Sequence, residues 1–253
     1  MNKLADKIAV VTGGSKNLGR HISLELAKEG AYTIILSHDE ALNSQVVSQI
    51  QKQGDKAEAH NIDLRDLEGL KKVFATILNK HKKVDTLVNN AGIAYFDFAK
   101  DIDEQKAAQS IDINLKAMYL ACKLVLPSML ANKSGVIANI SSLYGVRADK
   151  KTSIYSMTKF GIVGYTKGLD ADYKEQGIRA KVFCPTAFGE DCILKTEVLA
   201  GEIVKSISDP HDRYNQVVVL SKKIGFIKVL LFIKRKWNWI GWRDLVFYKF
   251  KIC

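Results

Sequence analysis

The chain has 253 residues, of which 47% are hydrophobic and 26% are charged, and this balance is typical of one folded domain rather than of a disordered segment. Its four cysteines lie far apart, and their spacing matches neither a disulfide framework nor a metal-binding CxxC pair. We therefore expect a reducing, cytoplasmic location. The five histidines show no HExxH-like spacing, so no metal site is predicted.

The net charge of +11 is concentrated at one end of the chain. Residues 222–253 hold nine basic side chains, one acidic side chain and all three tryptophans. We therefore divide the chain into a body, residues 1–221, and a basic, aromatic tail, residues 222–253. In one interpretation the tail lies at a membrane surface as a peripheral contact, with its cations against anionic lipid. In the other, its apolar side chains pack on the body or on a second subunit. Binding to nucleic acid is not expected, because no nucleic-acid module is present.

Along the chain, short runs rich in β-branched residues alternate with amphipathic stretches of helical length. Strands are expected at Ile8–Val11, Thr33–Leu36, Lys56–Ile62, Thr86–Asn89, Gly135–Ile140, Ala180–Cys184 and Gln216–Leu220. Helices are expected near Arg20–Glu29, in the stretch that ends at Gln53, and at Leu67–His81, Asp103–Leu130, Ser153–Gln176 and Thr196–Ile207. Such alternation favours parallel strands with crossovers on both faces. The expected fold class is α/β: a Rossmann-type, doubly wound sheet of seven mainly parallel strands with helices on both faces.

A glycine-rich turn, VVTGGSKNLGR, follows the first expected strand. Gly13, Gly14 and Gly19 lie between strand and helix, where backbone N–H groups and the helix dipole favour a phosphate. The spacing is close to T-G-x-x-x-G-x-G, with Asn17 in place of the middle glycine. Asparagine tolerates a left-handed backbone, although its side chain would crowd the phosphates. The turn predicts a dinucleotide site; the alternative is a tight turn without a ligand.

The end of the second strand bears on the choice of nucleotide. An acidic side chain there would bind the ribose 2′-hydroxyl of NAD(H). The sequence has Ser37 and His38 at this place, with Asp39 one residue later, and Lys16 in the glycine turn is placed to meet a 2′-phosphate. This pattern slightly favours NADP(H) over NAD(H). The alternative is that Lys16 is merely solvated and that Asp39 reaches the ribose.

Tyr155 and Lys159 are four residues apart in an expected helix and so share a face. Ser142 follows an expected strand, at the edge where α/β sheets bind ligands, and Asn114 lies in the long helix before it. Carbonyl reduction needs a proton donor for the developing alkoxide and a hydride from the other side. A tyrosine whose pKa is lowered by an ammonium can provide the proton, and a serine can hold the oxygen. The alternative is a half-buried aromatic ring beside a solvated amine.

The ordered set formed by TGGSKNLG, Asp63, NNAG at 89–92, Asn114, Ser142, Tyr155 and Lys159 resembles the short-chain dehydrogenase/reductase family, in its form of about this length, from about Lys7 to Leu220. The resemblance implies that Tyr155 is the general acid/base. It also implies that Lys159 holds the nicotinamide ribose and lowers the tyrosine pKa, that Ser142 orients the substrate, and that Asn114 holds a proton-relaying water.

The same resemblance implies that residues 1–221 form an NAD(P)-binding domain, in which Asp63 binds the adenine amine and NNAG closes the adenine-ribose pocket. Together with the glycine turn, it gives the expected cofactor-binding residues: Gly13, Ser15, Lys16, Asn17, Leu18, Gly19, Ser37, His38, Asp63, Leu64, Asn90, Ala91, Gly92, Tyr155, Lys159, Pro185 and Phe188.

Three features depart from the family pattern. Asn17 replaces a glycine, and Thr186 stands after Pro185 where the family usually has Pro-Gly. Glu190 occupies the place of a threonine that often caps the carboxamide. The basic tail replaces a short closing segment. Few residues separate the sixth and seventh expected strands, so we expect an open active site.

These observations predict an NAD(P)-dependent oxidoreductase of EC 1.1.1 type, a carbonyl reductase or alcohol dehydrogenase, that transfers a hydride between the nicotinamide and a small carbonyl/alcohol substrate. The alternative is a cofactor-binding scaffold or regulator with weak or no catalysis, attached to a membrane through its tail. It is motivated by Asn17, Thr186 and Glu190. The resemblance also implies a homodimer or homotetramer built on the helices Asp103–Leu130 and Ser153–Gln176.

Overall fold

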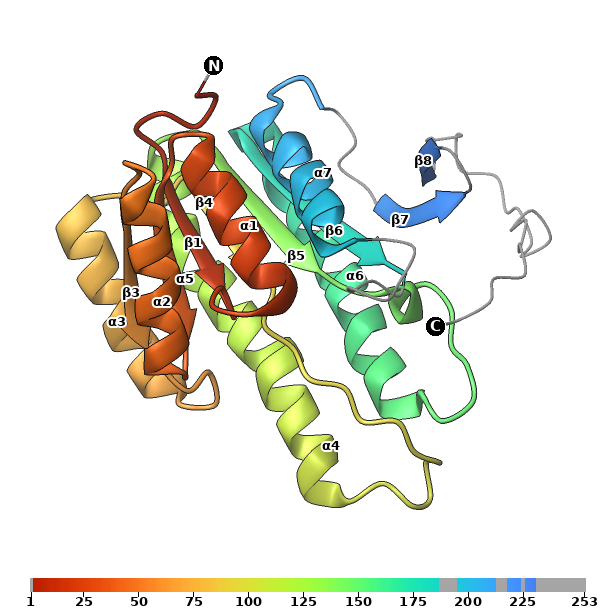
Figure 1. Ribbon diagram of the computed structural model, residues 1–253. Coiled ribbons are helices and arrows are strands. Elements are labelled where there is room, and N and C mark those ends of the chain that lie inside the picture. Colours follow the sequence, from red (N-terminus) through yellow and green to blue (C-terminus); the bar gives the residue numbers. More distant parts are fainter. Residues whose placement is uncertain (1, 187–194, 213–217, 224–225, 231–253) are drawn as a thin grey trace.

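The computed structural model describes residues 2–186, 195–212, 218–223 and 226–230. Its centre is one twisted sheet with the strand order β3-β2-β1-β4-β5-β6-β7-β8 (Figure 1). Every neighbouring pair is parallel except β7 and β8. The strands are β1 (Ile8–Thr12), β2 (Tyr32–Ser37), β3 (Ala57–Asn61), β4 (Thr86–Asn89), β5 (Gly135–Ile140), β6 (Ile178–Pro185), β7 (Val218–Lys223) and β8 (Phe226–Leu230).

Helices cover both faces of this sheet (Figure 1). They are α1 (Asn17–Lys28), α2 (Glu40–Lys52), α3 (Leu67–His81), α4 (Glu104–Ile111), α5 (Met118–Ala131), α6 (Ser153–Tyr173) and α7 (Thr196–Ser208), with the short turns η1 (Asp112–Ala117), η2 (Leu143–Gly145) and η3 (Lys174–Gln176). Alternate strand residues face opposite sides. Val10 therefore joins the core under α3, α5 and α6, whereas Ala9 and Val11 pack under α1 and α7.

The expected fold class is confirmed, with one difference in the strands. Six parallel strands, β1 to β6, form the body of the sheet, and β7 extends it in parallel over Val218–Lys223; Gln216, where this strand was expected to begin, lies outside the described residues. The added antiparallel strand β8 was not expected, because Phe226–Leu230 lies in the segment set apart as a tail on charge. Lysines are common on edge strands, so a basic composition does not argue against pairing. Residues 231–253, the remainder of that tail, lie outside the described residues.

The long helix expected before β5 is interrupted by η1, a π-helical turn between α4 and α5. A π turn adds a residue to the helical repeat and is frequent at functional sites. By length and composition alone, Glu104–Ala131 could cross a membrane. In the structure, however, Ala121, Cys122 and Val125 of this helix are fully buried in the core on the face of the sheet that α3 and α6 also cover.

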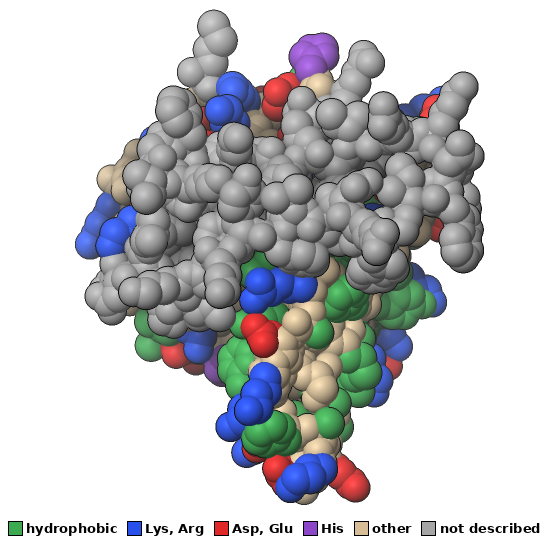
Figure 2. All heavy atoms as spheres, turned by 90° about the vertical axis from the view of Figure 1, so that its right-hand side faces the viewer, with side chains coloured by type: hydrophobic (Ala, Val, Ile, Leu, Met, Phe, Trp, Pro, Cys, Tyr) green, Lys and Arg blue, Asp and Glu red, His purple; other side chains and the backbone are tan. Residues whose placement is uncertain are grey.

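Figure 2 shows the molecule from the side on which Figure 1 draws β7 and β8. The part that is described narrows toward one end and carries basic, acidic and hydrophobic side chains close together. The larger exposed hydrophobic side chains of the described residues are Phe96, Phe98, Tyr119, Met157, Phe160 and Val198. Two of them, Phe96 and Phe98, follow the carboxyl end of β4, where the candidate site begins.

Candidate active site

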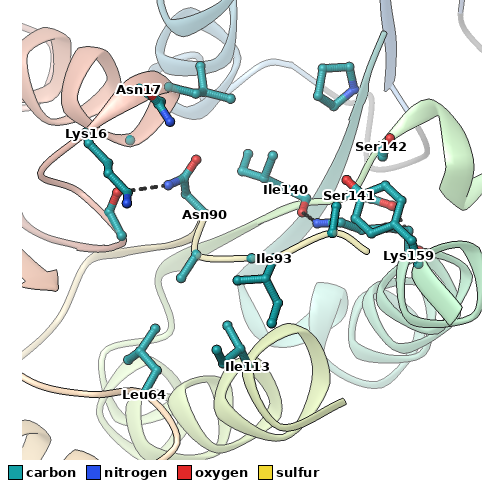
Figure 3. A pocket seen from close by; sticks show the side chains of 18 of the residues that line it. Lys16, Asn17, Leu64, Asn90, Ile93, Ile113, Ile140, Ser141, Ser142 and Lys159 are labelled. Carbon is teal, nitrogen blue, oxygen red and sulfur yellow. Dashed lines mark hydrogen bonds between the residues drawn. The ribbon is translucent and has the colours of Figure 1, made fainter. Parts of the chain in front are cut away.

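A cavity of about 750 Å³ opens at the carboxyl edge of the parallel strands. Lys16 and Asn17 lie at one end of it, Ser142 and Lys159 lie at the other, and Asn90 lies between them (Figure 3). The lining contains nearly all of the predicted site residues: Gly13, Ser15, Lys16, Asn17, Leu18, Gly19, Ser37, His38, Asp63, Leu64, Asn90, Ala91, Gly92, Ser142, Tyr155, Lys159 and Pro185. The fold thus brings together residues that are spread over most of the sequence.

Two predicted residues stand apart from this lining. Asn114 lies in η1, behind the cavity wall, and is buried. Phe188 lies outside the described residues, as does Glu190, so the departure that Glu190 represents stays a sequence observation. Thr186, which replaces the usual glycine, lines the cavity next to Pro185.

The glycine turn has the backbone that a bound phosphate requires. Gly13 has a φ of +62°, and a Cβ at Gly19 would overlap the carbonyl oxygen of Gly13, so neither position suits another residue. Asn17 has a φ of +48°, the left-handed conformation predicted for it. Asn90 braces the turn, because its Nδ2 donates to the carbonyl oxygens of Thr12 at 3.2 Å and Gly13 at 3.1 Å. This close-packed turn at the start of α1 fits the pyrophosphate of a dinucleotide.

The end of β2 lacks a free acid in the cavity. The carboxylate of Asp39 caps α2, where its Oδ1 accepts from the backbone N of Leu42 at 3.0 Å. The last residue of β2, Ser37, lines the cavity and is buried, and its Oγ lies 2.7 Å from Ser15 Oγ. The N-cap role thus engages one oxygen of the Asp39 carboxylate, and Asp39 is not among the residues that line the cavity.

Asp63 lines the cavity but already has a partner within the chain. The guanidinium Nε of Arg65 donates to both Asp63 carboxylate oxygens at 3.0 Å. These hydrogen bonds from Arg65 hold the pKa of Asp63 below its ordinary value. Arg65 was not predicted from the sequence, although arginine and carboxylate side chains often pair through two hydrogen bonds.

Tyr155 and Ser142 meet at the other end of the cavity. Burial raises the pKa of the Tyr155 phenol, and a hydrogen bond with Ser142 partly offsets this effect. Ser142 is held by η2, because its Oγ accepts from the backbone N of Tyr144 at 3.2 Å. Two groups that can share one carbonyl oxygen therefore lie together, on different elements of the fold.

Lys159 is fixed to β5 through both ends of the residue. Its Nζ donates to the carbonyl oxygen of Ile140 at 3.1 Å (Figure 3), and its own carbonyl oxygen accepts from Ser141 Oγ at 2.9 Å. The ammonium lies 5.5 Å from the centroid of the Tyr155 ring. Burial lowers the pKa of Lys159 to about 8. The lowering of the tyrosine pKa by this ammonium together with the oxidised nicotinamide stays a prediction; in the described residues the ammonium lies over the ring, and burial raises the pKa of the phenol.

Asn114 has a structural task that its position in the sequence did not reveal. Its Oδ1 accepts from the backbone N of Ile93 at 2.8 Å, and its Nδ2 donates to the Ile93 carbonyl oxygen at 2.9 Å and to Thr158 Oγ1 at 3.0 Å. The side chain thus ties η1 to the segment after β4 and to α6. Both amide hydrogens are used in this way, and the water-holding role of Asn114 stays a prediction.

Aromatic rings surround Tyr155. The ring of Phe96 lies 5.5 Å from that of Tyr155, and the ring of Tyr144 lies 6.1 Å from it, measured between centroids. Both residues line the cavity. They were not predicted, although each follows shortly after a motif that was. They form an apolar wall around the reacting groups and point to a substrate with apolar surface.

Comparisons with known proteins agree with this geometry. The family model for short chain dehydrogenase matches residues 7–196. "Oxidoreductase UcpA" of Salmonella typhimurium is 33% identical over 186 residues, which cover 73% of this chain and 70% of that protein. "3beta-hydroxysteroid dehydrogenase" of Mediterraneibacter gnavus is 32% identical over 190 residues, which cover 73% of this chain and 67% of that protein. The crystal structure of a metagenomic short-chain oxidoreductase in complex with NADP has a TM-score of 0.79 at 28% identity, covering 86% of this chain and 97% of that one.

The family match includes the glycine turn, the NNAG segment, Ser142, Tyr155 and Lys159, which the structure gathers around one cavity. It extends over well more than half of the chain, and the fold and the order of motifs agree with it. The chain therefore belongs to the short-chain dehydrogenase family of oxidoreductases.

Proposed function

We propose that the protein reduces a carbonyl group to an alcohol with a nicotinamide cofactor, with Tyr155 as the proton donor. The observation that carries this proposal is the placement of Tyr155 and Ser142 at one end of a continuous cavity that has the glycine turn at its other end. A dinucleotide laid along this cavity would be held by the residues of the turn and by Asn90, Ala91 and Gly92. When bound, it supplies the hydride.

The protein groups divide the remaining work. Ser142 and Tyr155 together hold the carbonyl oxygen, and the Tyr155 hydroxyl donates its proton as negative charge develops there. Because burial raises the pKa of Tyr155, the phenol is protonated at neutral pH, which suits the reductive direction. Lys159, buried and positively charged below a pH of about 8, stabilises negative charge at this end of the cavity.

We propose NADP(H) as the preferred cofactor. Asp39 is held as a helix cap, while Lys16 and His38 both line the cavity and can meet a 2′-phosphate. The related metagenomic oxidoreductase was solved in complex with NADP, which agrees with this choice.

The substitution Tyr155→Phe tests the proposed function. It removes the hydroxyl that donates the proton and keeps the ring, so we expect turnover of a ketone and aldehyde panel to fall by roughly 10²–10⁴-fold. NADPH affinity, measured by fluorescence of the reduced nicotinamide, should stay within twofold and exceed that for NADH. Tyr173→Phe, on the same helix but away from the cavity, is the control and should leave both quantities unchanged.

The outcomes separate this proposal from its alternative. Full activity in Tyr155→Phe would remove Tyr155 as the acid. Tight NADPH binding without turnover of any carbonyl would favour the cofactor-binding scaffold. Absence of binding to either nucleotide would contradict both.

The exposed side chains on α5 and α6 support the proposal that the chain assembles as a homodimer or homotetramer. Tyr119 on α5 and Met157 and Phe160 on α6 are each more than 40% exposed. Large apolar side chains gathered on neighbouring helices are typical of subunit interfaces. Analytical ultracentrifugation of the purified chain would measure the oligomeric state.

A further inference from the structure

The segment after β4 leads out of the cavity as a row of side chains. From Gly92 to Phe98, residues alternate between exposed and half-buried: Gly92, Ala94, Phe96 and Phe98 are exposed, and the residues between them are not. An extended chain directs alternate side chains to the same side. The cavity lining includes Gly92, Ile93, Ala94 and Phe96, and Phe98, which shares the exposed side with Phe96, comes two residues after it and outside this lining.

Two lysines from another loop stand over the end of this row. The Nζ of Lys150 lies 5.4 Å from the centroid of the Phe98 ring, and the Nζ of Lys151 lies 4.9 Å from it. Both lysines are exposed, and neither has a carboxylate partner among the described residues. The nearest acid in the sequence, Asp149, pairs with Arg147 at 3.1 Å. Two like charges are therefore held over one ring without a counter-charge.

The helix that follows these lysines adds to the positive potential. α6 begins at Ser153, and its N-cap residue, Thr152, gives no side-chain cap. The first turn of α6 contains no acidic residue. A helix N-terminus carries a partial positive charge, which an anion nearby would stabilise. The two ammonium groups and the helix end thus act in the same direction.

We propose that Lys150 and Lys151 bind an anionic group of the substrate. The substrates that this site prefers are then ketones, or the corresponding secondary alcohols, with an apolar body and a carboxylate, sulfate or phosphate on the far side from the carbonyl. Phe96 and Phe98 contact the apolar body, and the lysines contact the anion. The inference rests on the proposed function, because Tyr155 marks where the carbonyl lies.

The spacing of the row sets the length of such a substrate. The centroids of the Tyr155 and Phe96 rings are 5.5 Å apart. Phe98 lies two residues further along the chain, which adds at most roughly 7 Å. The anionic group is therefore expected on the order of 10 Å from the reacting carbon, on the same arithmetic.

A pair of ligands that differ in one charge tests the proposal. 4-(4-Oxocyclohexyl)benzoate carries a ketone and a carboxylate at about this separation, and its methyl ester has the same body without the charge. We expect the double variant Lys150→Gln/Lys151→Gln to lower kcat/KM for the carboxylate about fivefold, through KM, and to leave the ester unchanged. The loss should shrink in high salt, because exposed charges are screened.

The matched control removes two lysines elsewhere. Lys52 and Lys56 are exposed; Lys52 ends α2, and Lys56 directly precedes β3, the edge strand of the sheet. Lys52→Gln/Lys56→Gln changes the net charge equally and should affect neither ligand. A general effect of net charge would instead lower kcat/KM for the carboxylate equally in both double variants, and this result would overturn the proposal.

Binding of the two ligands, measured by calorimetry with cofactor present, separates this inference from the proposed function. Carboxylate binding that depends on Lys150 and Lys151 upholds the inference whether or not hydride transfer follows, so a failure of turnover counts against the proposed function alone. The inference is overturned by equal losses for carboxylate and ester, by no loss for either, or by binding of neither ligand to the wild-type protein.

Discussion

Two buried lysines, Lys159 on α6 and Lys181 on β6, show how the same residue type can serve architecture or chemistry. Lys181 is fully buried, and its Nζ contacts the Asp212 carboxylate at 2.8 Å and Ser206 Oγ at 3.2 Å. Lys159 is almost as deeply buried, but its Nζ donates to a backbone carbonyl, and no carboxylate of the described residues pairs with it. Burial lowers the pKa of both, and for Lys181 the aspartate works against this effect.

The difference teaches where to look for a site. A buried charge with a buried counter-charge is satisfied, and it fixes two parts of the chain to each other. A buried ammonium without a carboxylate partner destabilises the fold through its lost hydration. Such a group is therefore a candidate for a functional site. By this criterion Lys181 anchors the residues after α7, and Lys159 fits the role proposed for it in the active site.

The strongest test of this comparison is Lys159→Met. We expect kcat/KM to fall on the order of 10²–10³-fold, because the buried positive charge beside Tyr155 is lost. The free energy of unfolding at pH 7 should not decrease, since the substitution removes a charge that has no carboxylate partner. Steady-state kinetics and urea denaturation measure the two effects. Retained activity, or clear destabilisation, would place Lys159 with the structural lysines.

The complementary substitution, Lys181→Met, should act on stability. It leaves the Asp212 carboxylate buried without its ammonium, so we expect unfolding to be easier by about 3–5 kcal/mol. The kcat of the folded protein should stay within twofold. Adding Asp212→Asn removes the second charge and should restore most of the loss. A catalytic defect in the folded Lys181→Met protein would break the comparison.

A smaller effect is expected on the dependence of stability on pH. The folded-state pKa of Lys159 is about 8, below its ordinary value of 10.5. Below pH 8 Lys159 is protonated in both the folded and the unfolded state, and burial of its charge lowers the free energy of unfolding. Between 8 and 10.5 only the unfolded state keeps the proton, so this residue makes stability rise with pH, by at most about 3 kcal/mol.

The same ionisation should lower activity above a pH of about 8, because the charge beside Tyr155 is lost. Denaturation curves and rates collected from pH 7 to 10 would show both trends. Neither trend should remain in Lys159→Met, and their persistence there would assign them to another group.

Local patterns were sufficient to predict much of the fold and the site. The strands and helices alternate as expected because each has its own hydrophobic periodicity, and α3 begins and ends at the predicted residues. The glycine turn and the Tyr155–Lys159 pair depend on short-range spacing, so the sequence shows them directly. Asn17 adopts the predicted left-handed backbone for the same local reason.

The features that were missed depend on contacts between distant segments. The π turn at η1 and the role of Asn114 require knowledge of where Ile93 lies, 21 residues away. β8 pairs with β7 in a part of the chain whose charge suggested a separate tail. The row that ends at Phe98 gains its meaning only when Lys150 and Lys151, from another loop, are placed above it.

The double attachment of Lys159 has a mechanical consequence. Ser142 follows β5 and Tyr155 belongs to α6, so the two groups could drift apart if the strand and the helix moved independently. Lys159 joins these elements by two hydrogen bonds of its own, and a Cβ on Gly145 would collide with one of these bonds, between Ser141 Oγ and the Lys159 carbonyl. Serine and phenol are thus preorganised before any substrate arrives, and little binding energy is spent on bringing them into register.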